Sequence, residues 1–136
     1  MRRELPGGFE LDDNRTRVDL AELHRFLSTE AYWALGRPRE TVERLVREAS
    51  RVVGLYLDGR LVGFARTVSD GVSFAYLADV YVQPELRGLG LGEELVREAV
   101  NGSSFAGVRW LLHTRDAHAL YAKVGFGTPS ERLMER

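Results

Sequence analysis

The glycine-rich segment at residues 82–92 constrains the fold of this chain more than any other feature. It reads Val82-Gln-Pro-Glu-Leu-Arg87-Gly88-Leu-Gly90-Leu-Gly92 and follows a long apolar run, roughly Val72 to Val82, that predicts a strand. A helix is predicted next, ending at Asn101-Gly102, and its apolar face consists of Leu91, Leu95, Val96, Ala99 and Val100. A short apolar run around Trp110, Val108 to His113, predicts another strand, which is expected to be buried. This order favours a right-handed crossover between two parallel strands.

Local signals place the remaining elements. Asp19 begins a capping box with Glu22, which predicts a helix with an apolar face. Pro38 suits the first position of a second helix. The dipeptide Asp58-Gly59 lies between two alternating apolar runs and predicts an antiparallel hairpin. Asp116 is expected to cap a short helix that runs through Lys123 and ends at Gly125.

These elements predict an α/β fold with a mixed, mostly antiparallel sheet and helices on both faces. The expected order is strand, two helices, three strands, helix, strand and helix, with one or two further strands in a short tail. Residues 1–8 and 127–131 are expected to be loose. No linker or repeat divides the sequence, so we expect a single domain over residues 1–136.

Composition excludes several classes of protein. The 136 residues carry a net charge of −1, which argues against a broad nucleic-acid-binding surface. No apolar run is long enough for a membrane span, and no signal peptide is recognisable. The chain contains no cysteine, which excludes disulfides, thiolate metal sites and a cysteine nucleophile. Its three histidines lack a metal-ligand spacing, so no metal is expected. A cytoplasmic protein fits these features best.

The glycines indicate an anion site. A helix N-terminus carries unpaired N–H groups and a partial positive charge, and glycine lets phosphate approach them closely. A P-loop would need Lys-Ser or Lys-Thr after the glycines, and the dinucleotide motif would need its third glycine where Glu93 stands. Neither motif fits. The glycines can also serve close packing of a strand and a helix, which would require no ligand.

The pattern Val82-x-Pro-x-x-Arg87-Gly88-x-Gly90-x-Gly92 resembles the signature of the GCN5-related N-acetyltransferase (GNAT) family. Downstream, Leu120-Tyr121-x-Lys123-x-Gly125-Phe126 is similar to the family's second block. The two blocks stand in the family's order and spacing, and residues 31–38 resemble uncharacterised bacterial members. The resemblance implies a GNAT-like fold whose two central parallel strands splay apart around acetyl-CoA. It also implies direct transfer of the acetyl group to a primary amine.

The resemblance further implies roles for individual residues. Tyr121 falls on the family's general-acid tyrosine, which protonates the sulfur of coenzyme A. Asp116 stands where many members carry an asparagine that contacts pantetheine. A backbone N–H near Val80 would stabilise the developing oxyanion. The residues expected to bind acetyl-CoA are Val80, Tyr81, Val82, Arg87, Gly88, Leu89, Gly90, Leu91, Gly92 and Asp116.

The acceptor side is less defined by the sequence. The residues expected to contact the acceptor are Tyr32, Trp33, Phe74, Tyr76, Asp79 and His113. Polyamine acetyltransferases of the family place a glutamate base at the position of Ala78. The neighbouring Asp79 would point to the opposite face of a regular strand, although a β-bulge would change its direction. The general base is therefore left unassigned, and water relayed to a carboxylate is one route.

Two functions are consistent with these motifs. The first is an N-acetyltransferase whose acceptor is a small-molecule or peptide amine. The alternative is a non-catalytic domain that binds acetyl-CoA as a sensor or partner module. An acyl group longer than acetyl and a homodimeric assembly both remain open.

Overall fold

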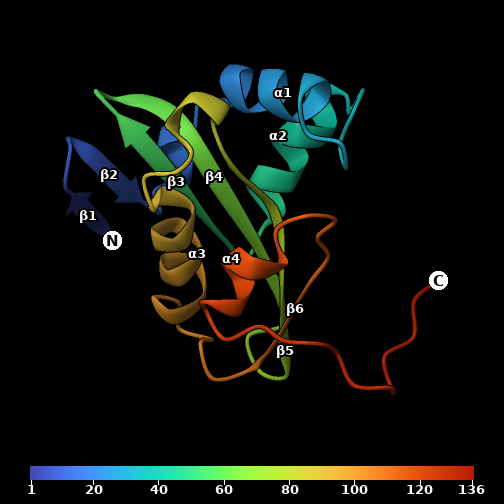
Figure 1. Cartoon of the computed structure of the whole chain (residues 1–136). Helices are drawn as coiled ribbons and strands as arrows, with labels where there is room; N and C mark the ends of the chain where they lie inside the picture. The colour runs from blue at the N-terminus through green and yellow to red at the C-terminus, as the bar shows by residue number, and fades with distance from the viewer.

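A computed structural model describes residues 1–136 of the chain. Its strands form one six-stranded sheet in sequence order, β1 to β6 (Figure 1). The first four pairs of neighbours are antiparallel, and β5 pairs with β6 in parallel. The strands are β1 (Arg2–Leu5), β2 (Phe9–Asp12), β3 (Arg51–Leu57), β4 (Arg60–Ser69), β5 (Phe74–Val82) and β6 (Arg109–Leu112). The predicted mixed, mostly antiparallel sheet is confirmed.

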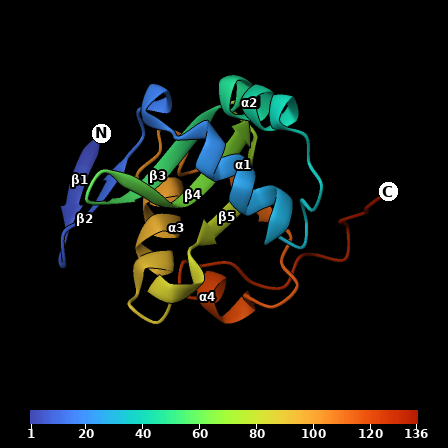
Figure 2. The same ribbon diagram turned by 90° about the horizontal axis from the view of Figure 1, so that it is seen from above.

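The α-helices lie on both faces of the sheet, as predicted (Figure 2). They are α1 (Leu20–Thr29), α2 (Arg39–Glu48), α3 (Leu91–Asn101) and α4 (His118–Ala122). Residues of α1 and α2 pack against one face around Phe64 and Tyr81, while α3 packs against the other face around Leu55 and Leu77. Two short 3-10 turns occupy 15–17 and 84–86. None of the helices has both the length and the apolar character needed to cross a bilayer.

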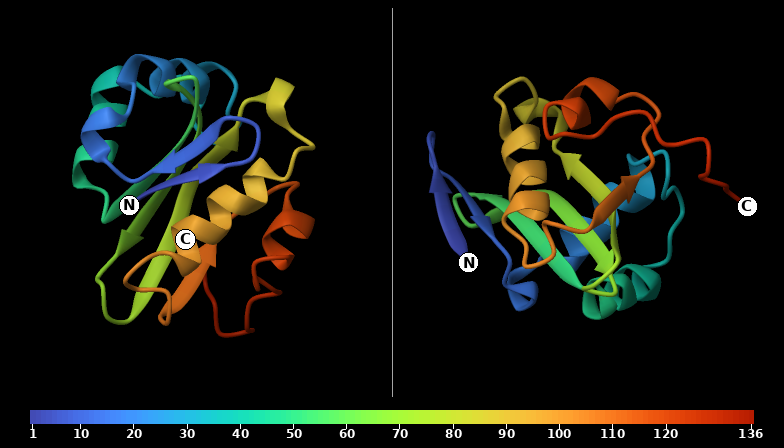
Figure 3. Two further views of the ribbon diagram at one scale, coloured as in Figure 1. Left: turned by 90° about the vertical axis from the view of Figure 1, so that its left-hand side faces the viewer. Right: turned by 90° about the horizontal axis from the view of Figure 1, so that it is seen from below.

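The parallel strands separate as they run toward the glycine-rich segment. Their pairing begins at Phe74↔Arg109 and ends at Leu77↔Leu112, whereas β5 continues to Val82. One edge of the segment from Ala78 to Val82 therefore has no partner strand. The glycine-rich segment follows directly and leads into α3, which crosses over the sheet to β6 (Figure 3).

Several local predictions are confirmed by the contacts that produce them. The Asp19 side chain accepts a hydrogen bond from the Glu22 backbone N–H at 3.1 Å and so caps α1. Asp58 and Gly59 take φ angles of 51° and 78°, the left-handed pair that a tight hairpin turn requires. All five apolar residues predicted for α3 are buried against the sheet. Each of these signals lies within a few residues of the feature that it predicts.

Other predictions about the elements are wrong. Residues 1–8 are not loose, because Arg2–Leu5 pairs with Phe9–Asp12 as the first hairpin of the sheet. The tail contains no strand after β6. Helix α2 begins at Arg39, so Pro38 precedes the first helical position. Strand β6 is only partly buried, because it forms the last strand of the sheet.

Candidate active site

A cleft of about 990 Å³ opens where β5 and β6 diverge. Its walls come from β5, the glycine-rich segment, the loop between α1 and α2, and the loop between β6 and α4. Most of the residues predicted to bind acetyl-CoA or the acceptor line this one cleft. Leu89 and Phe74 do not: Leu89 is exposed, and Phe74 pairs with Arg109 at the opposite end of β5.

The glycine-rich segment presents unpaired donors to the cleft. Backbone N–H groups of residues 88–93 donate to no group within the chain, and the first bond of α3 runs from the Glu94 N–H to the Gly90 carbonyl. Gly88 and Gly90 have φ angles of 84° and 78°, and a Cβ at either position would meet only open space. These donors, together with the positive end of α3, have the chemistry needed to hold a pyrophosphate. The site therefore fits coenzyme A.

Arg87 helps to fix the start of this segment. Its Nε donates to the Val82 carbonyl at 3.1 Å, which ties the segment to the end of β5. The other guanidinium nitrogens of Arg87 have no partner in the chain, and the residue lines the cleft. Glu93, in the first turn of α3, pairs with Arg97 at 2.6 Å, so its charge is offset near the anion site.

Tyr121 lies on α4 and faces the same cleft. Its ring packs edge-on against Phe126, with the centroids 5.9 Å apart. The side chain is buried, and no hydrogen bond within the chain engages its hydroxyl. Burial, with a smaller contribution from Tyr32, raises the pKa of Tyr121 to about 12. The phenol is therefore protonated at neutral pH and free to donate.

Asp79 interrupts the regular alternation of β5. Arg66 pairs with Ala78 and Phe64 with Tyr81, so Asp79 and Val80 together lie opposite Ala65. This is a β-bulge, and Asp79 takes a φ of 54° within it. In a regular strand Asp79 would share the face of Leu77, which packs in the apolar core beneath α3. The bulge instead turns its carboxylate toward α1 and α2.

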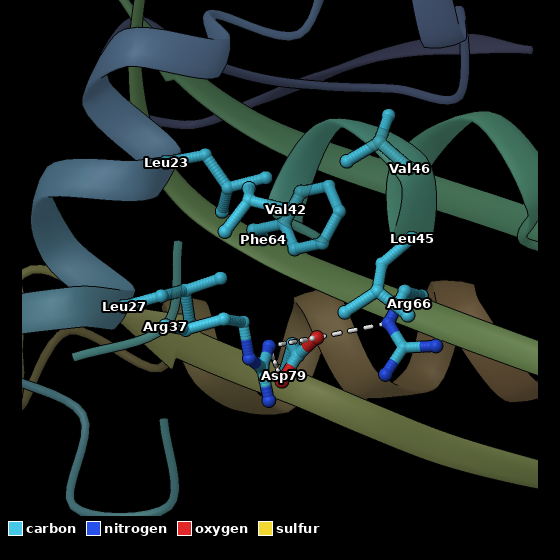
Figure 4. A pocket seen from close by; sticks show the side chains of 9 residues that line it. All are labelled: Leu23, Leu27, Arg37, Val42, Leu45, Val46, Phe64, Arg66 and Asp79. Atoms are coloured by element: carbon cyan, nitrogen blue, oxygen red, sulfur yellow. Dashed lines mark hydrogen bonds and ion pairs between the residues drawn. The ribbon is translucent and has the colours of Figure 1, made fainter. Parts of the chain in front are cut away.

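On that face the carboxylate of Asp79 lies between the side chains of Arg37 and Arg66 (Figure 4). Arg37 Nη1 lies 3.0 Å from each carboxylate oxygen, Arg66 Nε lies 2.8 Å from Oδ2, and Trp33 Nε1 donates to Oδ1 at 2.9 Å. Burial alone would raise the pKa of Asp79, but the charges of Arg66 and Arg37 lower it below its ordinary value. Asp79 is therefore an ion-paired anchor for the loop between α1 and α2.

Tyr32 connects the two loops that border the cleft. Its hydroxyl accepts a hydrogen bond from the Arg115 backbone N–H at 2.8 Å, and the Arg115 guanidinium lies 3.8 Å from the ring centroid. The Tyr32 ring also packs edge-on against Trp33. The loop between α1 and α2 thus contacts the loop between β6 and α4.

Tyr76 and His113 also line the cleft, where their side chains contact each other. The Tyr76 hydroxyl is hydrogen-bonded to His113 Nδ1, and His113 Nε2 is bonded to the Glu135 carboxylate from the C-terminal segment. Burial, with the charge of Glu135, raises the pKa of Tyr76 above its ordinary value. The predicted acceptor residues Tyr32, Trp33, Tyr76, Asp79 and His113 therefore all line this cleft, and together they are called the acceptor wall below.

The capping role predicted for Asp116 is wrong. Helix α4 begins at His118, its preceding residue is Ala117, and no side chain caps it. Thr114 Oγ1 accepts the Ala117 N–H at 3.0 Å and orders the turn instead. Asp116 is exposed at the rim of the cleft, and its predicted contact with pantetheine remains a prediction.

Sequence reasoning missed Arg37, Arg66 and Arg115 as residues of the cleft. A signal existed for Arg66, because a charged residue directly follows the apolar run Leu61–Ala65 within one strand. Arg37 and Arg115 lie in loops, and nothing in their local sequence indicates which distant group they contact.

A model of the acetyltransferase (GNAT) family matches residues 16–126, which include every residue that lines the cleft. The chain belongs to the GNAT family of acetyltransferases. The glycine-rich segment, the diverging parallel strands and Tyr121 all lie within the residues that the family model matches.

Similar proteins agree with this assignment. The chain is 38% identical over 100 residues to serotonin N-acetyltransferase 2 of Oryza sativa subsp. japonica. This match covers 68% of the chain but only about half, 48%, of that relative. It is 29% identical to an uncharacterised N-acetyltransferase of Porphyra purpurea, covering 83% of this chain and 67% of the relative. A GNAT-family crystal structure from Xanthomonas campestris pv. campestris superposes with a TM-score of 0.89 at 38% identity, covering 98% of this chain and 94% of the other.

Proposed function

We propose that this acetyltransferase transfers the acetyl group of acetyl-CoA directly to a primary amine of a small molecule or peptide. The observation that carries the proposal is the shared cleft: the unpaired N–H groups of residues 88–93 and the Tyr121 side chain face one space at the fork of β5 and β6. Donors for a pyrophosphate and an acid within the same cleft suit a thioester held along the unpaired edge of β5. The similarity to a serotonin N-acetyltransferase supports an amine acceptor.

Acetyl-CoA would supply an acetyl thioester, whose carbonyl carbon is attacked by the neutral amine as its carbon–sulfur bond breaks. The N–H groups of residues 88–93, with Arg87 beside them, would hold the pyrophosphate. The free edge of β5 from Val80 to Val82 would pair with pantetheine, and an N–H near Val80 would bind the developing oxyanion. Holding both reactants in one cleft would provide much of the rate.

Tyr121 would give its proton to the departing sulfur and recover it from solvent. Thiols have a pKa of about 8.5 in water, well below the value of about 12 for Tyr121, so transfer in water would be unfavourable. Burial in the cleft raises the pKa of the thiol as well, because it disfavours the thiolate. The ammonium proton of the acceptor would leave to water at the cleft mouth before attack. The second nitrogen proton, released as the amide forms, would also pass to water and would balance the proton that Tyr121 recovers from solvent.

A Tyr121→Phe variant tests this role. We expect kcat to fall by about tenfold or more, the low end of general acid catalysis, with the Kd for acetyl-CoA nearly unchanged. Thiol release from acetyl-CoA with a panel of amines measures kcat, and calorimetry measures Kd. Tyr56→Phe is the matched control, because it removes an unpartnered hydroxyl from a buried tyrosine outside the cleft. An unchanged rate for Tyr121→Phe would exclude the acid role.

The same assay separates the enzyme from a non-catalytic sensor. A sensor would bind acetyl-CoA tightly and release no thiol with any amine in the panel. Turnover with at least one primary amine, with the acetyl group recovered on nitrogen, would exclude the sensor. Accumulation of an acetylated protein before product forms would contradict direct transfer.

A further inference from the structure

The charges around Asp79 do not balance. Two guanidinium groups, those of Arg37 and Arg66, contact one carboxylate, which leaves one excess positive charge. The side chains of Arg37, Arg66 and Asp79 are only 19%, 12% and 3% exposed. Burying an uncompensated charge is costly, so a second anion in this place would be stabilised.

The two arginines also retain unused hydrogen-bond donors. Each guanidinium has five N–H groups. Arg66 uses only its Nε on Asp79, and Arg37 uses only its Nη1. Among side chains that are not exposed, the only fully buried polar atoms without a partner are the hydroxyls of Tyr56 and Tyr81. The free nitrogens of both arginines therefore keep some contact with solvent, and both residues line the cleft.

Other carboxylates of the cleft do not supply the missing charge. Glu30 pairs with Arg25, Glu93 with Arg97, and Asp116 lies nearest to Arg115. None of these three acids contacts Arg37 or Arg66. The excess charge therefore remains for a ligand that enters the cleft.

Arg66 lies at the end of the cleft where the chemistry is expected. It pairs with Ala78, one residue beyond the last parallel pair, Leu77↔Leu112. The unpaired N–H groups of residues 88–93 follow the far end of β5, after Val82. The two positive sites are thus separated along β5, and the one at Arg66 lies on the acceptor wall beside Trp33 and Asp79.

From this geometry we infer that Arg66 and Arg37 form an oxyanion subsite for the acceptor, so that the favoured acceptor is an amine that also carries a carboxylate or a phosphate. The inference rests on the proposed function, because it names the acceptor class of the same site. A planar guanidinium fork binds carboxylates and phosphates through paired N–H···O bonds. A second ammonium group on the acceptor would instead be repelled by the same two side chains.

Matched acceptor pairs test the inference on the wild-type protein. Tyrosine against tyramine differs only by a carboxylate, and O-phosphoethanolamine against ethanolamine differs only by a phosphate. We expect kcat/KM to be higher for at least one anionic member by about tenfold or more, the discrimination expected of a hydrogen bond to a charged group. The carboxylate and phosphate arms show which oxyanion is bound. Equal or greater activity with both neutral amines would overturn the inference.

Variants then assign the preference to Arg66. Arg66→Gln should abolish the preference by raising KM for the anionic acceptor, with the neutral acceptor and the Kd of acetyl-CoA little changed. Arg66→Lys keeps the charge and should keep part of the preference. Arg109→Gln, on the exposed side of β6 and outside the cleft, is the control. An equal loss of kcat/KM for both acceptors, or weaker binding of acetyl-CoA, would show that Arg66 stabilises the fold or contributes to coenzyme binding and does not select the acceptor.

A binding measurement keeps the inference testable if Arg66→Gln does not fold. The probe is 3-(4-hydroxyphenyl)propionate, which has the carboxylate of tyrosine and lacks the amine. We expect it to compete with the acceptor in the wild-type assay and to raise Tm in the presence of coenzyme A. Ethyl phosphate is the matching probe for the phosphate arm, because it has the phosphate of O-phosphoethanolamine and lacks the amine. No effect of either probe up to about 10 mM, which would saturate a millimolar site, would overturn the inference. If no amine of any kind is acetylated, the proposed function itself fails; if only neutral amines are acetylated, the inference alone fails.

Discussion

Replacing Asp79 with asparagine should be among the most damaging conservative changes in the chain. Asparagine has the same shape and still offers Oδ1 to Trp33, but it leaves Arg37 and Arg66 without a counter-charge in a place where the Asp79 side chain is 3% exposed. Removing one partner of a buried ion pair costs about 3–5 kcal/mol. We use about 3 kcal/mol because both arginines keep some contact with solvent.

That loss can be expressed as a change in Tm. Unfolding entropy is about 2.1 cal/mol/K per residue, so for 136 residues a loss of about 3 kcal/mol lowers Tm by about 10 °C. Calorimetry and urea unfolding would measure the loss. Glu43→Gln is the matched control, because it breaks an exposed pair with Arg39 on α2 and should cost less than about 1 kcal/mol.

The dependence on pH gives an independent check of the same contact. The pKa of Asp79 in the folded protein lies below its ordinary value of 3.8, so the carboxylate stabilises the fold above about pH 4 and loses this effect as the pH falls through the lowered value. The difference between wild type and Asp79→Asn should be full at pH 7 and shrink below about pH 4. A loss no larger than that of Glu43→Gln, or one independent of pH, would refute the argument.

Three further outcomes follow from the structure. Tyr81→Phe should leave the urea midpoint unchanged or raise it, because the buried Tyr81 hydroxyl has no hydrogen-bond partner. A loss of more than about 1 kcal/mol in the free energy of unfolding would show that this hydroxyl does have a partner. Gly90→Ala should destabilise the fold by about 1–2 kcal/mol, because Gly90 has a φ of 78°. Gly92→Ala should fold normally, because its Cβ would lie 3.5 Å from Leu120, an ordinary van der Waals contact. Thermal unfolding followed by circular dichroism compares the two variants. With the pKa of Tyr121 at about 12, kcat should not fall as the pH rises through 10, and an alkaline decline centred there would contradict the acid role.

The sequence predicted those parts of the fold that local chemistry determines. Asp19, Asp58-Gly59 and the glycines at 88–92 act on backbone within a few residues of themselves, so their effects are visible in a short window. The apolar face of α3 is equally visible, because helical periodicity repeats within the segment itself. The two sequence blocks that resemble the family, at 82–92 and 120–126, both lie within the residues 16–126 that the family model matches.

Strand β1 could not be predicted because its own residues favour no strand. Arg2, Arg3 and Glu4 show no apolar alternation, and the strand forms by pairing with β2 and by the ion pair of Arg2 with Glu10. Tertiary pairing therefore overrides local preference at this edge. Conversely, Asp116 has the right residue type for a cap, yet Thr114 orders the turn before α4.

The acceptor wall was hardest to predict because it depends on one residue that breaks the strand pattern. Asp79 contacts Trp33 and Arg37, which lie 46 and 42 positions earlier in the chain, and it reaches them only because the bulge turns it away from the core beneath α3. A left-handed residue other than glycine costs about 1–2 kcal/mol, which is less than the about 3 kcal/mol expected to be lost when the two arginines have no carboxylate to pair with. The bulge and the ion pairs therefore stabilise each other, and neither is expected to persist without the other.

This coupling links the two sides of the cleft. The bulge follows the last parallel pair, Leu77↔Leu112, so the strand edge expected to hold pantetheine begins beside the residue that fixes the loop between α1 and α2. A change at Asp79 should then disturb the acceptor wall and the coenzyme edge together. A change at Arg66 leaves Asp79 bonded to Arg37 and Trp33, so the bulge should persist and the effect should fall mainly on the acceptor wall. Comparing Asp79→Asn with Arg66→Gln for both ligands would separate the framework of this site from its choice of acceptor.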